Sequence, residues 1–178
     1  KGEIRDVQES VGDLKLYVDG AFSDGIISES EATSIEKYIN IVNNEKQQAL
    51  ATYNGLYNNP YLEGSAKTSL SNAKVSLFSS IDALINAINT AIADGKATSG
   101  EKSDVDTKYA TFTTDYNKFY AAVESANKSI QDKLKGYSDN AQMAADKANN
   151  NASQAMEDAN EAKEAVTNLN DYVDGGFS

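Results

Sequence analysis

Two Asp-Gly pairs, Asp24-Gly25 and Asp94-Gly95, combine a carboxylate with a turn residue, as calcium-binding loops do. A loop of the EF-hand type needs oxygen ligands at positions one, three and five, glycine at six and glutamate at twelve. With the first glycine at position six, Gly20 and Phe22 fall at positions one and three, and neither offers a carboxylate. The second loop fails at the same positions. We therefore interpret both pairs as turns that lead into capped helices, and we expect no metal site there.

The sequence also lacks most of the residues and motifs on which enzymes rely for catalysis. The 178 residues contain no histidine and no cysteine, which removes the commonest general base, the commonest metal ligand and the thiolate nucleophile. No glycine-rich phosphate-binding motif occurs. Carboxylates spaced by two, such as Glu29 with Glu31 and Asp104 with Asp106, fall in first helical turns, where they favour the helix dipole. We expect neither an enzyme nor a bound cofactor.

The ten tyrosines are the unusual part of the composition. A weak contact site for a glycan or a protein partner is predicted at the tip formed by Tyr57, Asn58, Asn59 and Tyr61, because aromatic faces stack on sugars. At helical spacing, however, tyrosine more often belongs to a core, with its hydroxyl at the edge.

The net charge of the chain further restricts its possible binding partners. Sixteen basic against 27 acidic residues give a formal net charge of −11, which repels nucleic acid and anionic lipid. No uninterrupted apolar run approaches the roughly 20 residues that span a bilayer. We expect neither nucleic acid nor a membrane as partner.

Apolar residues at steps of three and four predict three helices, over residues 28–57, 65–93 and 98–135. A capping residue precedes each of them: Ser28 with Glu31, Ser65, and Thr98 with Glu101. Their apolar stripes are wide enough to need a shared core. The sequence therefore predicts an antiparallel three-helix bundle over residues 23–135.

Narrower stripes lie on either side of this bundle. In the C-terminal segment 136–178 an uninterrupted heptad stripe consists of Ala141, Ala145, Ala148, Ala152, Ala155, Ala159, Ala162, Val166, Leu169 and Val173. In the N-terminal segment 1–22 the same spacing is shown by Ile4, Val7, Val11, Leu14 and Val18. We expect an all-α protein: a three-helix bundle flanked by long helices of coiled-coil type. The alternative is that the flanking helices pack on the surface of the bundle.

Two internal repeats support this organisation. Val166–Ser178 matches Val11–Ser23 at eight of thirteen positions, 155 residues apart. A fixed long period is typical of arrays of structural units. We expect the chain to be about one repeat of a longer protein, which continues after Ser178 with Asp-Gly and a capped helix. We also expect the chain to enter one end of the bundle and to leave from the opposite end. A weaker pattern, D-G-x-x-[ST]-x-x-E, occurs at Asp24 and again 70 residues later, and it fits a duplication of helical hairpins.

Three runs resemble a helical module of large tail proteins of tailed bacteriophages and prophages: DGIISESEATSIEKYI, EKQQALATYNGLYNNPYL and INAINTAIADGKATSGEKSDVDTKYATF. The resemblance covers about residues 20–135. It implies a non-enzymatic structural spacer in a tail-tip, tail-fibre or minor structural protein of the virion, with a host-recognition tip carried elsewhere. It also implies a homo-oligomer, namely a homotrimer or a homohexamer, the trimer being favoured, in contact with other tail proteins. The alternative is a module of a bacterial surface adhesin or stalk that binds a host protein or glycan.

Overall fold

The structure, a computed structural model, describes the backbone of residues 2–176 and the side chains of residues 5–176. Its helices are α1 (Gly2–Ala21), α2 (Glu29–Tyr57), α3 (Gly64–Ile92) and α4 (Ser99–Gly176). Among the described residues the β-structure is limited to one isolated antiparallel bridge between Ile26 and Lys96. The predicted all-α class is confirmed. The chain divides into two units, Lys1–Gln131 and Asp132–Ser178, and each is described by itself.

The expected helix starts are reproduced at two of three places. Ser28 and Thr98 each accept a hydrogen bond from the backbone N–H of a glutamate three residues later, at 3.3 Å, and that carboxylate accepts from the backbone N–H of the capping residue at 2.9 Å. The prediction for Ser65 was wrong. α3 begins one residue earlier, with Glu63 as the capping residue and no side-chain cap. Gly64 takes a positive φ of 60°, which turns the chain into the helix at little cost.

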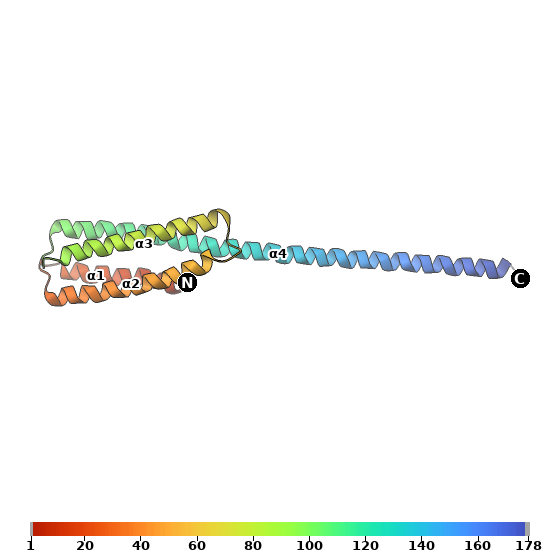
Figure 1. Cartoon of the computed structure of the whole chain (residues 1–178), viewed down its shortest axis with the longest axis horizontal. Coiled ribbons are helices and arrows are strands. Elements are labelled where there is room, and N and C mark those ends of the chain that lie inside the picture. Colours follow the sequence, from red (N-terminus) through yellow and green to blue (C-terminus); the bar gives the residue numbers. More distant parts are fainter. Residues whose placement is uncertain (1, 177–178) are drawn as a thin grey trace. The chain divides into compact units, whose positions relative to one another are not determined.

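The first unit has one apolar core to which all four helices contribute (Figure 1). The stripes predicted for the three central helices supply much of it, with fully buried side chains that include Ile35, Leu77, Ile81, Leu84, Phe112 and Phe119. Burial decreases toward the ends of these stripes, where Leu56 is partly buried and Leu134 is exposed.

Helix α1 belongs to this bundle, which differs from the expected boundary at residue 22. Val7, Val11, Leu14 and Val18 are buried in the same core as the other helices. α1 packs against α2, where the ring of Tyr17 lies 5.2 Å from that of Tyr38. The physical reason is that three helices leave one side of their core open, and the stripe of α1 covers it. The first unit is therefore a four-helix bundle, and the N-terminal segment is not a separate coil. The side chain of Ile4 lies outside the described residues.

The two Asp-Gly loops meet at one end of this bundle. Ile27 N–H donates to the carbonyl of Gly95 at 2.9 Å, and Ala97 N–H donates to the carbonyl of Gly25 at 3.1 Å. Both glycines have positive φ, 81° and 72°, and a Cβ on Gly95 would meet the carbonyl oxygen of Ile27 at 3.4 Å. Loops that look like independent turns in the sequence therefore form one paired structure, which fixes the start of α4 beside the end of α1.

The two paired loops lie at corresponding places in two similar helical hairpins, α1–α2 and α3–α4. Asp24 and Asp94 each accept from the backbone N–H two residues on, at 3.0 Å in both loops. Buried residues coincide at the same spacing of 70: Val7 and Leu77, Val11 and Ile81, Leu14 and Leu84, Val18 and Ile88, Ala21 and Ala91, Ile35 and Val105, Val42 and Phe112, Ala49 and Phe119. The weak sequence pattern thus extends through the cores of both hairpins, as a duplication of helical hairpins would require.

The path of the chain through the bundle differs from the expected one. α1 ends, and α4 begins, at the paired loops. α1 therefore starts, and the bundled part of α4 ends, on the side away from those loops (Figure 1). The expectation that the chain enters and leaves at opposite ends was wrong, because it counted three helices where the unit has four.

Helix α3 is long and apolar enough to cross a membrane, judged by length and composition alone. In the bundle its apolar stripe is occupied, since Leu70, Leu77, Ile81, Leu84 and Ile88 are buried. Lys74 and Asp82 lie outside this buried stripe, and Asp82 pairs with Lys46 of α2. These features are those of a core helix.

Truncation of a core side chain tests the bundle. Leu77→Ala and Phe112→Ala each remove a fully buried side chain, and each should lower the free energy of unfolding by about 2–5 kcal/mol. Val75→Ala, on the exposed side of α3, is the matched control and should change it by less than about 0.5 kcal/mol. Urea unfolding followed by circular dichroism measures all three. Equal midpoints for Leu77→Ala and the control would contradict the core described here.

Candidate functional site

The tip between α2 and α3 holds the four residues predicted as a contact site. Asn58 caps α2, its backbone N–H donating to the carbonyl of Asn54 at 3.0 Å. The Asn59 side chain accepts from the backbone N–H of Tyr61 at 2.9 Å. Leu62, directly after them, is buried and anchors the turn in the core. The two asparagines therefore have turn-forming roles.

The aromatic rings at the tip already have partners in the chain. The ring of Tyr57 lies 5.2 Å from that of Tyr53, nearly parallel to it, and the ammonium of Lys67 lies 4.6 Å from its centroid. A shallow depression of about 450 Å³ runs from Tyr57 along the first turns of α3, lined mostly by polar residues. Tyr61 is 36% exposed and is not among the residues that line this depression. The tip offers one half-buried ring and amide groups, which is a modest surface for a sugar.

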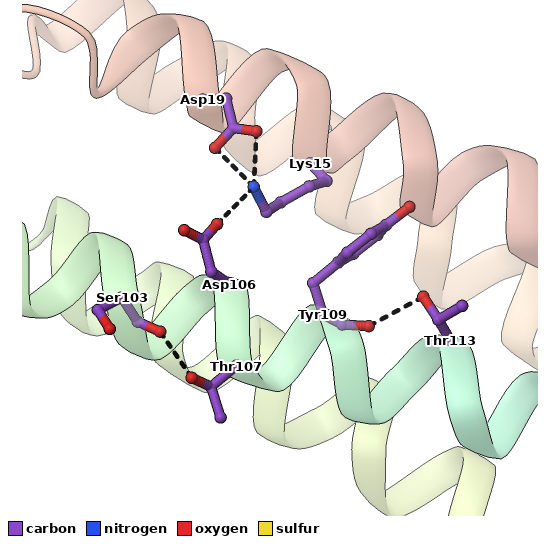
Figure 2. A network of polar contacts seen from close by, with 7 residues as sticks. All are labelled: Lys15, Asp19, Ser103, Asp106, Thr107, Tyr109 and Thr113. Carbon is purple, nitrogen blue, oxygen red and sulfur yellow. Dashed lines mark hydrogen bonds and ion pairs between the residues drawn. The ribbon is translucent and has the colours of Figure 1, made fainter.

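A second polar cluster joins α1 to α4, and the sequence did not single it out. Lys15 is almost fully buried, and its ammonium contacts both carboxylate oxygens of Asp19 at 2.6 Å and Asp106 at 2.8 Å (Figure 2). It also lies 5.7 Å from the centroid of the Tyr109 ring. In the sequence, this cluster is indicated by a lysine directly after Leu14, in a helix whose apolar stripe lies in the core of the bundle.

The electrostatics of this cluster favour the charged lysine. Burial alone would lower the pKa of Lys15, but hydrogen bonds and charge attraction from Asp106 and Asp19 outweigh it and hold the pKa above its ordinary value. The nearby hydroxyls are used within α4: Thr107 and Thr113 donate to the carbonyls of Ser103 and Tyr109, at 2.8 and 3.0 Å (Figure 2). A cation neutralised by two carboxylates is suited to joining helices and has no free capacity for proton transfer.

The Asp-Gly loops show no calcium chemistry in the part of the chain that is described. Their aspartates accept from backbone N–H groups, and Glu31 and Glu101 belong to capping boxes. Within residues 2–176, no group of three or more acidic residues gathers in a way that could hold a metal ion.

The second unit carries an exposed apolar stripe. From Asp132 to Gly176 the chain is one helix whose described side chains are exposed, apart from a partly buried Lys133. The stripe consists of Ala141, Ala145, Ala148, Ala152, Ala155, Ala159, Ala162, Val166, Leu169 and Val173, and each is exposed. Beside it the helix carries pairs four residues apart, such as Lys135 with Asp139 at 2.6 Å and Gln154 with Asp158 at 3.0 Å. This alternation of a narrow apolar stripe and polar pairs is typical of a coiled-coil strand.

The buried cation gives a pH-dependent prediction. Lys15→Met should lower the free energy of unfolding at pH 7 by about 1 kcal/mol, since the pair is part-buried while both aspartates reach solvent. Because the folded-state pKa of Lys15 is raised, its contribution is complete below its ordinary value of 10.5 and is lost as the pH rises further. The difference between wild type and variant should therefore shrink as the pH rises above about 10.5. Urea unfolding at pH 7 and 11 measures it, with Lys118→Met as an exposed control. A difference that stays constant would exclude this role for the ammonium.

Comparison with known proteins gives one finding. Residues 115–177 match the family model of the alanine zipper of the major outer membrane lipoprotein. The match spans the exposed alanine stripe and the preceding part of α4, and it agrees with the coiled-coil character of that helix. No curated protein and no solved structure matches the chain. Over residues 115–177 the chain is therefore similar to an alanine zipper.

Proposed function

We propose that the chain is a non-enzymatic structural spacer, in which the alanine stripe of α4 associates with copies of itself and the four-helix bundle forms a module beside it. The observation that supports this most directly is the exposed stripe from Ala141 to Ala162 on an otherwise polar helix, in the segment that resembles an alanine zipper.

Energetics favour association of this stripe. An isolated helix in water is only marginally stable, and most helical stability in proteins comes from packing of an apolar face. Residues 132–176 have no such packing within their unit. Alanine buries little area, about 0.8 kcal/mol for each buried CH₂, but it lets helix backbones approach closely. Weak contacts repeated over several heptads are therefore the expected source of stability, and a trimer is the favoured assembly.

The proposed setting is the tail of a bacteriophage or prophage, as the resemblance of residues 20–135 implies. There the spacer would hold a host-recognition tip in position, in contact with other tail proteins. A spacer needs length and regular spacing, and it needs no pocket. The part of the chain that is described suits this, because its polar clusters are used in turns and helix contacts.

A second candidate is a stalk or adhesin module on a bacterial cell surface. It is favoured by the family description, since the matched alanine zipper is that of an outer membrane lipoprotein. The half-buried ring of Tyr57 and the depression beside it would then be the surface offered to a host glycan or protein. Antibodies against the bundle would separate the settings: labelling of purified virions supports the tail, and labelling of intact cells without virions supports the cell surface.

Charge placed on the stripe tests the association. Ala152→Glu puts a carboxylate in the centre of the proposed seam, where like charges from each copy would meet. Asn151→Glu introduces the same group one residue away, off the stripe. Sedimentation equilibrium over a range of concentrations should show that Ala152→Glu weakens association roughly tenfold or more, equivalent to about 1.4 kcal/mol, while the control stays near wild type. If wild type is monomeric at all concentrations, or if both variants behave alike, the zipper proposal fails.

A further inference from the structure

The last part of the exposed stripe differs in kind from the alanines before it. Val166, Leu169 and Val173 are 58%, 61% and 44% exposed. Their counterparts in the 155-residue repeat, Val11, Leu14 and Val18, are at most 1% exposed in the core of the four-helix bundle. The same short sequence is thus buried in one copy and uncovered in the other.

The apolar residues that α1 places deepest in the core are identical in the two copies. The buried positions Val11, Leu14 and Val18 keep the same residue in the second copy. On the exposed side of α1, Asp13 becomes asparagine and Leu16, itself 73% exposed, becomes aspartate, while the buried Lys15 and Ala21 become asparagine and glycine. A zipper of small residues does not require this valine and leucine pattern, whereas packing into a bundle as α1 does.

Two further positions of the second copy also suit a helix that packs as α1 does. Tyr172 corresponds to Tyr17, whose ring packs on Tyr38 of α2. Thr167 corresponds to Gly12, where the nearest heavy atom to an added Cβ is the hydroxyl of Tyr109 at 3.9 Å, an ordinary contact distance. A Cβ at the position of Gly12 is therefore accommodated in a site of this shape.

One difference argues against docking of Val166–Gly176 on the bundle of another molecule of this chain. Lys15, which pairs with Asp106, is replaced in the second copy by Asn170. In the bundle described here Asn170 would leave the Asp106 carboxylate without its cation, and α1 of that bundle is already in place. The α1 site of this chain thus favours its own helix.

We propose that Val166–Gly176 is the first helix of another bundle of this fold, formed with residues that follow it in the polypeptide. Its Val166, Leu169 and Val173 face docks on an α2-type helix of that bundle. The alanine stripe before residue 166 can still associate with other chains, so this inference does not rest on the proposed function.

A tandem protein tests this directly. It consists of residues 1–178 followed at once by a second copy of residues 24–135, so that Ser178 takes the place of Ser23. Since the chain has no cysteine, Leu169→Cys provides a single thiol on the docking face. In the 178-residue chain this thiol should react rapidly with a maleimide. In the tandem protein it should react on the order of 100-fold more slowly, because labelling then requires local opening. Met156→Cys, 69% exposed and outside the repeat, should react equally in both proteins.

A second substitution checks the register. Asn170→Lys should restore the ion pair with the Asp106 position of the appended unit and slow labelling of Leu169→Cys further. Asn168→Lys, which corresponds to the exposed Asp13, should not. A general increase in positive charge would make the two lysine variants alike, and that result would overturn the α1-type register.

The other outcomes are also decisive. Slow labelling in the 178-residue chain that depends on its concentration would assign the face to a coil between copies, and rapid labelling in the tandem protein would remove the proposal. A control tandem, with residues 159–178 replaced by residues 4–23, must protect Cys at the Leu14 position of the replaced segment. It shows that the appended unit can fold when it has a true α1. Neither result depends on whether the alanine stripe trimerises.

Discussion

Burial of four narrow apolar stripes against one another is the constraint on which the first unit depends. None of its helices can cover its own stripe, and each is polar on the opposite face. The stripe of α1 is as necessary as the others, because Leu14 and Val18 fill the core with no exposed surface. The paired Asp-Gly loops set the relative positions of α1 and α4, and the buried ammonium of Lys15 joins the same helices a few residues further along.

The described residues of the second unit lack this mutual coverage, and their exposed stripe is the surface that we propose to be functional. A helix with separate apolar and polar faces satisfies its backbone hydrogen bonds but not its apolar side chains. The stripe changes along its length, from alanines that allow close helix approach to the valines and leucine of the repeat. The two parts are suited to different neighbours, one to copies of the same helix and the other to a bundle.

Much of the fold was predictable from local patterns. The capping boxes at Ser28 and Thr98 and the three- and four-residue spacing located α2, α3 and the start of α4 to within a residue or two. The place of α1 was not predictable, because its stripe has the same spacing and residue types as the segment around Leu169. The spacing of apolar residues indicates that one face of a helix is apolar, but it does not indicate which segment of the chain covers that face. For the same reason the buried role of Lys15 was missed, and the tip was recognised as a turn while the contacts of Tyr57 with Tyr53 and Lys67 were not.

The direction of the chain through the four-helix bundle has a mechanical consequence. Tension applied through the start of α1 and the end of the bundled part of α4 would act on the side away from the paired loops. Such a load peels the two helices apart one turn at a time, which resists far less force than sliding them lengthwise past each other. Lys15 and the loop pairing lie at the far side and would yield last. A tether made of such modules would lengthen in steps under load and absorb a sudden pull.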